Sequence, residues 1–274
     1  MADSDYLYDS ARHANSFVTE FLALIHYREL ARQMISRSIK TRYKRSALGV
    51  IWTMLNPLLT MLVLTIVFST LFRFQIEHYP VYILSGLLAW NFFASTTNLA
   101  MGEMLWSGDL LKRIYLPKAI FVVSTTGSGL VNIGLSMVPL LIIMLITRTP
   151  ITSSMLILPV SILALTIFAM GVGFILSTIV VYFQDIMPIY EVVLMMGMYA
   201  TPIIYPPEII PERFQFITKL NPVYYFVRCF QEPIFKGQIP SLETWITTFL
   251  IAIFTLIVGW YIFTRKVSEY AYRA

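Results

Sequence analysis

Long apolar stretches separated by short polar segments dominate the hydrophobic pattern of this chain. Each stretch has close to the ~20 apolar residues that a helix needs to cross about 30 Å of hydrocarbon. They are Val50–Phe72, Val81–Met101, Lys118–Thr147, Ser154–Phe183, Pro188–Tyr205 and Trp245–Phe263. The pattern predicts an all-α membrane protein with six transmembrane helices.

The segment Phe17–Arg45, ahead of the first span, has the pattern of an amphipathic helix. Its apolar residues recur at helical spacing and most polar residues fall on the opposite side, which favours a helix lying along the membrane surface. Two functions are open for this interfacial helix, a lipid-binding anchor or a docking surface for a cytoplasmic partner. Its apolar set is Phe21, Ile25, Ile35, Ile39 and Tyr43.

The loop between the fifth and sixth spans, residues 205–240, is apolar but repeatedly interrupted. Proline breaks a helix because it lacks the backbone N–H and clashes with the preceding turn. We therefore expect short re-entrant segments at the outer face, with protein or water covering their backbone. The prolines are Pro206, Pro207, Pro211, Pro222, Pro233 and Pro240.

Charge placement predicts the orientation of the chain. Most of the 20 lysines and arginines lie before the first span, around the loop 106–117 or after the last span. The positive-inside rule then places both termini in the cytoplasm and the protein in the cytoplasmic (inner) membrane, with the first span as an uncleaved signal anchor. The chain divides into a cytoplasmic N-terminus (1–49), a transmembrane domain (50–264) and a cytoplasmic tail (265–274).

Composition excludes several function classes. Hydrophobic residues make up 57% of the chain and charged residues 13%, against about half and a quarter in soluble proteins. The spans leave little soluble mass for an enzyme domain. The basic residues cluster at span ends, so we expect no nucleic-acid partner. The single cysteine, Cys229, excludes an intramolecular disulfide.

Motifs for catalysis and for metal binding are missing from the sequence. No G-x-x-x-x-G-K-[ST] phosphate loop occurs, and neither does an H-E-x-x-H zinc motif or a nucleophile elbow. Glu103, Asp185 and Glu191 fall near span ends, whereas a proton-coupled carrier usually places an ionisable residue at mid-membrane. We expect no catalytic residue, no metal and no cofactor in this chain, and an energy source outside it.

Two stretches resemble a known family. Arg42–Trp52 reads R-Y-K-R-S-A-L-G-V-I-W and is followed by Asn56-Pro57. It is similar to the R-Y-x-x-S-x-L-G-x-x-W pattern of the membrane subunits of type-2 ABC exporters for O-antigen, capsule and teichoic acid. The run from Leu110 to Pro117 resembles the coupling loop of that family. Asn221-Pro222 also fits, whereas Gln184-Asp185 stands where the family has Arg-Asp.

The resemblance implies a permease subunit that exports a lipid-linked polysaccharide. It implies a homodimer with two copies of a separate ABC ATPase, which binds the ATP and Mg, and a channel between the two permeases. The amphipathic loop 106–117 would then be a lever for the ATPase instead of an ordinary basic loop. The ATPase-coupling residues are Asp109, Leu110, Leu111, Lys112, Arg113, Ile114 and Tyr115.

Aromatic residues, 15% of the chain, could line such a channel, because their faces stack on the C–H faces of sugar rings. The alternative for each is helix packing or the interfacial belt. The channel candidates are Tyr43, Trp52, Trp90 and Phe93. Three other functions stay open: export of a drug or lipid, a membrane-embedded glycan-modifying acyltransferase, and a signalling or assembly protein.

Overall fold

The computed structural model covers residues 1–274 and describes residues 16–43, 51–71, 76–106 and 116–266. Throughout these ranges the regular structure is helical, as expected. Six helices correspond to the apolar stretches: α3 (Ile51–Ile66), α4 (Tyr79–Trp106), α6 (Ala119–Ile146), α7 (Leu158–Tyr182), α8 (Ile186–Ala200) and α11 (Leu242–Lys266). The remaining helices are α1 (Ser16–His26), α2 (Arg28–Tyr43), α9 (Gln215–Leu220) and α10 (Pro222–Phe235), with short turns η1 (Val67–Leu71), η2 (Ser153–Ile157), η3 (Pro207–Ile209) and η4 (Glu212–Phe214).

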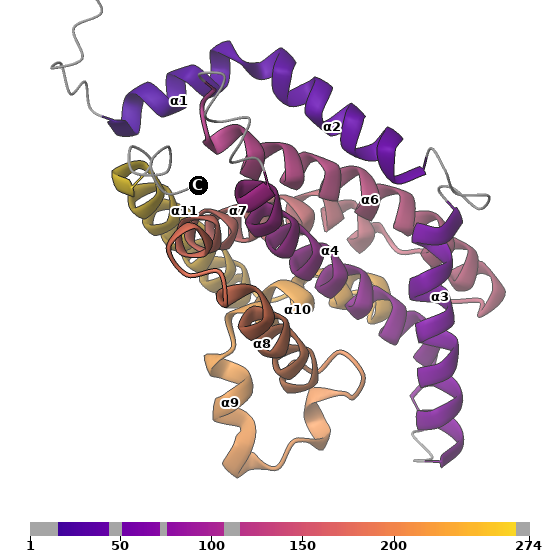
Figure 1. The fold of residues 1–274 in the computed structure, drawn as a ribbon. Helices are drawn as coiled ribbons and strands as arrows, with labels where there is room; N and C mark the ends of the chain where they lie inside the picture. Colours follow the sequence, from indigo (N-terminus) through magenta and orange to yellow (C-terminus); the bar gives the residue numbers. More distant parts are fainter. Residues whose placement is uncertain (1–15, 44–50, 72–75, 107–115, 267–274) are drawn as a thin grey trace, which may run out of the picture.

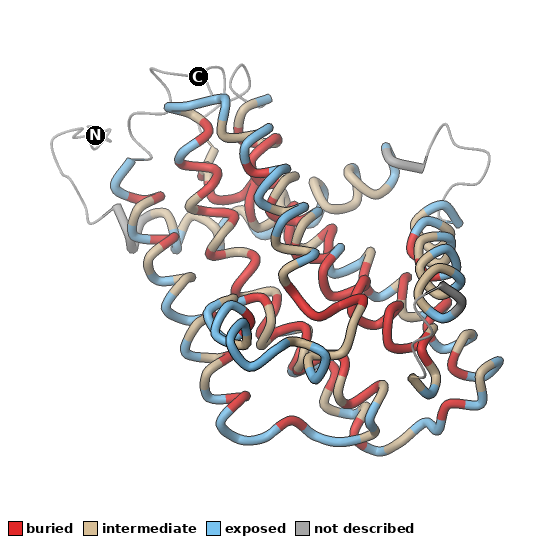
Figure 2. The backbone as a smooth tube through the Cα atoms, turned by 90° about the horizontal axis from the view of Figure 1, so that it is seen from below, coloured by how far each residue is buried: buried red, intermediate tan, exposed pale blue. Residues whose placement is uncertain are grey.

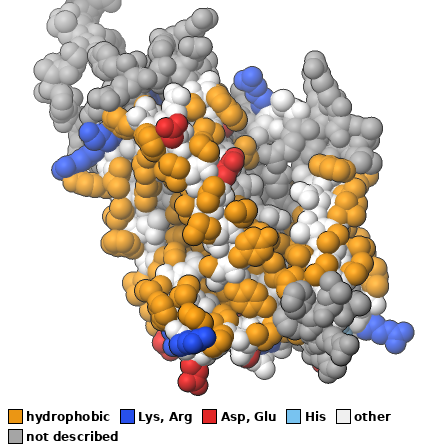
Figure 3. Space-filling view, turned by 60° about the horizontal axis from the view of Figure 1, so that its bottom comes forward, with side chains coloured by type: hydrophobic (Ala, Val, Ile, Leu, Met, Phe, Trp, Pro, Cys, Tyr) orange, Lys and Arg blue, Asp and Glu red, His pale blue; other side chains and the backbone are white. Residues whose placement is uncertain are grey.

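Four of the helical segments are long and apolar enough to cross a membrane. They are Ile51–Ser69, Ala119–Ile146, Ser153–Tyr182 and Leu242–Lys266. Apolar side chains cover much of the molecular surface, and the few charged side chains lie mostly toward its edges (Figure 3). An apolar exterior of this kind is suited to lipid as the surrounding solvent.

The central helix of the bundle is α4, which is 28 residues long but less apolar than those four segments. It packs against α3, α6, α7, α8 and α10, and most of its residues are buried (Figures 1 and 2). Its polar groups find partners on neighbouring helices. The Thr97 and Tyr190 hydroxyl oxygens lie 2.7 Å apart, and the Ser177 hydroxyl donates to the Ala100 carbonyl at 3.0 Å. Neighbouring helices therefore shield the polarity of α4 from lipid.

The amphipathic N-terminal segment is helical, as predicted, but consists of two helices that meet at Tyr27. Figure 1 shows α1 and α2 across one end of the bundle, with α9 toward the opposite end. Phe21 and Ile25, expected on the apolar face, are exposed. The side chains packed against the bundle include Leu24, Tyr27, Leu30, Ala31 and Met34.

The fifth helix ends earlier than the apolar pattern predicted. It stops at Ala200, and Thr201 is extended because a residue before proline is disfavoured in helical conformation. The backbone from Thr201 to Tyr205 is held by tyrosines of α4. The Tyr79 hydroxyl donates to the Ile204 carbonyl at 2.6 Å, and the Tyr82 hydroxyl lies 2.7 Å from the Pro202 carbonyl oxygen.

The proline-interrupted segment forms η3, η4, α9 and α10. Helix α10 is in the core, packed against α4, α7 and α11, whereas most of α9 is exposed. Asn221 starts α10, because its side-chain oxygen accepts the Val223 N–H at 3.0 Å. Further along α10, the Gln231 amide donates to the Tyr82 carbonyl at 3.0 Å.

Candidate functional site

A groove of about 470 Å³ opens between α3, α4 and α6, with one residue from α8. Its walls combine amide and hydroxyl side chains with aromatic rings. They are Trp52, Thr53, Asn56, Pro57, Leu88, Asn91, Phe92, Ala94, Ser95, Asn98, Gly129, Asn132, Ile133, Ser136 and Leu194.

Helical spacing brings the polar side chains to the same wall. Asn91, Ser95 and Asn98 lie at i, i+4 and i+7 on α4, so they share one face of that helix. Asn132 and Ser136 lie one turn apart on α6. Two adjacent helices therefore each contribute a polar stripe to the groove.

The groove is open on one side. Asn56, Asn91 and Ser95 are exposed. Asn56 lies on α3, whose other exposed residues are mostly apolar, and Asn91 and Ser95 are two of the few exposed residues of α4. Hydrocarbon offers no hydrogen-bond partner, and an unsatisfied polar group costs several kcal/mol there. This side of the molecule must therefore face water or another protein.

The residue types of the groove are suited to a ligand rich in hydroxyl groups. Each asparagine amide offers two N–H donors and a carbonyl acceptor, and each serine or threonine hydroxyl can donate or accept. A sugar hydroxyl can likewise both donate and accept a hydrogen bond. Trp52, with 55% of its surface exposed, adds a flat apolar face at the groove.

The structure brings one of the predicted channel residues, Trp52, to this groove. Trp90 and Phe93 are buried in the core of the chain, 4% and 5% exposed. Trp90 packs over Gly197 of α8, where an added Cβ would lie 2.9 Å from the indole. The Phe93 ring stacks on Phe168 with 5.2 Å between centroids. The channel role of all three stays a prediction.

The remaining predicted residues lie at or beyond the limits of the described structure. Tyr43 is the last residue of α2, and its side chain is outside the described part. The whole coupling set, Asp109 to Tyr115, falls outside the described residues. Its role in ATPase coupling also stays a prediction.

Sequence reasoning missed the asparagines of the groove. It quoted Asn56 only as part of the family pattern and proposed none of Asn91, Asn98 and Asn132 as site residues. A usable signal was present, since an amide recurring on one face of an apolar helix indicates a protein-facing or water-facing stripe. The pairing of α4 with α3 and α6 could not be seen from that signal.

Both α1 and α2 contact α6, the helix that follows the predicted coupling residues in the sequence. Ile35 of α2 packs directly over Gly127, and Glu20 of α1 lies near the first turn of α6. Burial raises the pKa of the Glu20 carboxyl to about 6, while the charge of Lys118 and a hydrogen bond from the Ala119 backbone N–H oppose this shift. The interfacial helices are thus attached to the helix that follows the loop 106–117.

Comparison with known proteins gives the family. The ABC-2 type transporter family matches residues 29–235, from α2 to the end of α10. The chain belongs to the ABC-2 type transporter family. That range contains the whole groove and the predicted coupling loop. The resemblance seen in the sequence is confirmed, and with it a place among transport proteins.

Individual relatives of this ABC-2 family member are similar over most of their length. The O-antigen export system permease protein RfbA of Myxococcus xanthus is 28% identical over 250 residues, 90% of this chain and 96% of that protein. RfbA of Klebsiella pneumoniae is 27% identical over 238 residues, 86% and 91% of the two chains. The polysialic acid transport protein KpsM of Escherichia coli is 22% identical over 224 residues, 81% and 86%.

Proposed function

We propose that this chain is the permease subunit of an ATP-driven exporter that moves a lipid-linked polysaccharide across the cytoplasmic membrane. The polar groove between α3, α4 and α6 is the observation that carries the proposal. It offers hydroxyl-matching groups along the spanning helices, on a side that lipid cannot cover. The relatives support the cargo class, since their names describe O-antigen export and polysialic acid transport.

The proposed topology has six spans, with both termini in the cytoplasm. Helix α4 is a span shielded by its neighbours, as its buried surface supports. Helix α8, with 15 residues, reaches only about 22 Å. Residues 201–205 extend this span, and the Tyr79 and Tyr82 hydroxyls cover their carbonyls. Non-helical backbone is tolerated at membrane depth only with such cover.

The proline-interrupted segment forms the re-entrant part at the outer face in this arrangement. One face of α10 is apolar and buried among α4, α7 and α11, which supports a position within the membrane. The exposed α9 then lies nearer the outer surface. The helices α1 and α2 lie along the cytoplasmic surface, where the exposed Phe21 and Ile25 contact lipid.

A second copy of the chain would close the groove. The exposed amides of Asn56 and Asn91 would then line a channel between two subunits instead of facing hydrocarbon. A closed two-fold dimer is the commonest assembly of identical chains. Two copies of a separate ATPase would bind ATP and Mg and engage the residues from Asp109 to Tyr115. Closure of the ATPases would move α4 and α6, which flank that loop and form the groove.

An export assay tests this function. The gene is deleted in the host, and a plasmid that encodes the chain and its ATPase restores it. Polysaccharide is then quantified at the cell surface and inside the cell. Deletion should leave the glycan inside. Asn91→Leu should lower surface glycan at least about tenfold, equivalent to about 1.4 kcal/mol. Asn91→Gln, which keeps the amide, should retain most export.

The matched control is Thr166→Val. It removes a polar group from α7 whose hydroxyl bonds only within its own helix, to Ile162, outside the groove. Normal surface glycan in the deletion strain would refute the proposal. If deletion instead changed resistance to a drug or the lipid composition of the outer leaflet, the same architecture would have a different cargo.

A further inference from the structure

A second cavity, of about 290 Å³, lies at the end of the molecule opposite α1 and α2. It is enclosed by the start of α4, the turn η3, the helix α9 and one face of α10. The proposed export mechanism assigns it no role. Its volume is near the lower limit of small-molecule pockets, about 300 Å³. Its polar side chains include Tyr82, Lys219, Tyr224, Arg228, Gln231 and Glu232.

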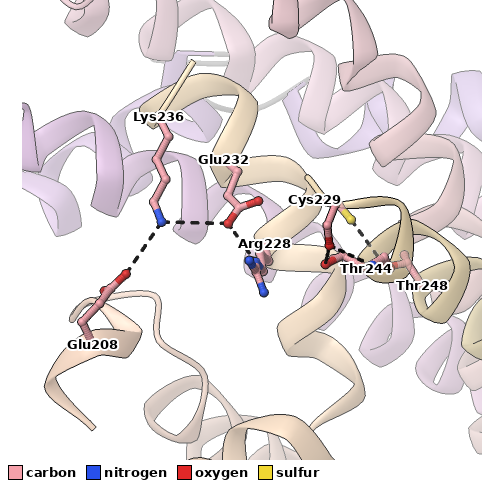
Figure 4. A network of polar contacts seen from close by, with 8 residues as sticks. Glu208, Arg228, Cys229, Glu232, Lys236, Thr244 and Thr248 are labelled. Carbon is pink, nitrogen blue, oxygen red and sulfur yellow. Dashed lines mark hydrogen bonds and ion pairs between the residues drawn. The ribbon is translucent and has the colours of Figure 1, made fainter. Parts of the chain in front are cut away.

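A chain of ion pairs crosses the wall of this cavity (Figure 4). Arg228 Nε donates to Glu232 Oε1 at 2.8 Å. Lys236 Nζ lies 3.9 Å from the same oxygen and 3.7 Å from Glu208 Oε1 on η3. Glu232 is the most buried member, with 14% of its side chain exposed. The charges of Arg228 and Lys236 are therefore compensated by the two carboxylates, and Lys219 adds one further cation to the lining.

Further polar groups surround these pairs. The Arg228 guanidinium donates a hydrogen bond to the Tyr224 hydroxyl oxygen, which places the phenol ring beside the ion pair. The Gln231 side chain is buried and fits only because residue 86 is glycine, since a Cβ there would collide with its amide. A guanidinium, a carboxylate, an amide and an aromatic ring thus meet within one cavity.

We propose that this outer cavity binds a single hydroxyl-rich sugar unit of the outgoing chain. The inference rests on the proposed function and adds to that function a recognition site after the channel. A sugar hydroxyl needs a donor and an acceptor close together, and an ion-paired carboxylate and guanidinium supply both as charge-assisted hydrogen bonds. The Tyr224 ring gives the C–H face of the sugar an apolar surface. The site is suited to a neutral sugar, since Arg228 and Lys236 are already paired with Glu232 and Glu208.

The test uses the permease with its ATPase in lipid nanodiscs. Methyl glycosides of glucose, galactose, mannose, rhamnose and N-acetylglucosamine are titrated separately and followed by saturation-transfer NMR. The wild type should bind at least one of them saturably, with a Kd in the millimolar range. Glu232→Gln should weaken that binding at least about tenfold, and Tyr224→Leu, which removes the ring, should weaken it several-fold. Inorganic phosphate should not compete.

The control is Glu212→Gln, an exposed acid of the same outer segment that does not line the cavity. It should bind like the wild type. Thermal unfolding of each variant separates lost binding from lost fold. If the Glu232→Gln variant unfolds, Lys219→Met is tested in its place. Lys219 lines the cavity but is exposed, and its replacement should weaken binding.

Three results would overturn the inference: no saturable glycoside binding, equal binding in a folded Glu232→Gln variant, or displacement by phosphate. The export assay is scored in parallel in the deletion strain. Normal glycan export without glycoside binding refutes this site and leaves the proposed function standing. If glycan export does not depend on this chain at all, the proposed function itself is refuted.

Discussion

Gly171 of α7 and Gly259 of α11 bring the backbones of these two helices into direct contact. A Cβ on Gly171 would lie 2.6 Å from the backbone nitrogen of Leu256, and a Cβ on Gly259 would collide with the Gly171 carbonyl. Small residues allow this approach in lipid, where no hydrophobic force pulls helices together. The contact explains why α7 and α11 pack along so much of their length.

Gly171→Ala should therefore destabilise the protein. The added methyl group meets backbone atoms, which cannot rotate away, so overpacking of about 1–3 kcal/mol is expected. Thermal unfolding of the detergent-solubilised protein measures the effect. The control is Gly134→Ala in α6, where a Cβ would meet no atom within 4 Å. Equal melting temperatures for Gly171→Ala and the wild type would contradict the argument.

Asn221→Ala should loosen the start of α10. The Asn221 side chain accepts the Val223 N–H at 3.0 Å and donates to the Thr201 hydroxyl at 2.7 Å, joining α10 to the end of α8. Loss of an N-cap costs about 0.5–2 kcal/mol. Asn221→Asp should fall between alanine and wild type, because it keeps the cap and loses the donor. Denaturant unfolding measures the stability of the wild type and of the Asn221→Ala and Asn221→Asp variants, and Gln238→Ala, at an exposed position, is the control. Equal stability of the wild type and the two Asn221 variants would exclude the capping role.

Glu20 should make stability depend on pH. Burial raises its pKa from 4.5 to about 6. Between these values the unfolded chain releases the proton while the folded chain keeps it, so stability is full below about pH 4.5 and falls as pH rises to 6. Glu20→Gln should remove this fall and gain about 1–2 kcal/mol at pH 7.5, with no gain at pH 4.5.

Unfolding of the solubilised protein at the two pH values measures this difference. Glu29→Gln, at an exposed position on α2, is the matched control and should change stability at neither pH. A gain from Glu20→Gln that is equal at pH 4.5 and 7.5 would show that ionisation of the carboxyl is not its cause.

Leu111→Asp should separate the subunit from its ATPase. We expect normal insertion and yield, because the sequence predicts residue 111 in a loop between spans, but loss of the ATPase on co-purification and at least about tenfold lower export. Leu111→Met keeps an apolar side chain and should behave as wild type. Normal export by the aspartate variant would remove residue 111 from the coupling set.

Some features were accessible to sequence reasoning because they depend on residues close in the chain. The interfacial segment was predicted at 17–45 and is found as two helices over 16–43. The break at Tyr27 was not predicted, whereas Ile35 of the predicted apolar face does pack on the bundle, over Gly127. Phe21 and Ile25 fit the apolar stripe, yet they are exposed, because docking on the bundle uses Leu24 and Leu30 instead.

The candidate site was less predictable. Trp90 and Asn91 are adjacent in sequence, but successive helical residues point 100° apart, so one is buried against α8 and the other faces the groove. From the sequence alone, Trp90 and Asn91 are an aromatic and a polar residue within the same predicted span, and neither can be assigned to the core or to the groove. Only the positions of α3, α6 and α8 around α4 distinguish core from groove.

The sequence by itself determined the helical class, the apolar stretches, the interrupted outer segment and the family. Each of these follows from local composition, because transfer of a helix into lipid is a sum over its own residues. The tertiary structure decided the central place of α4, the wall of asparagines, and the ion pairs between η3 and α10. These depend on which helices meet, and contacts between segments far apart in the chain leave no local pattern from which they can be inferred.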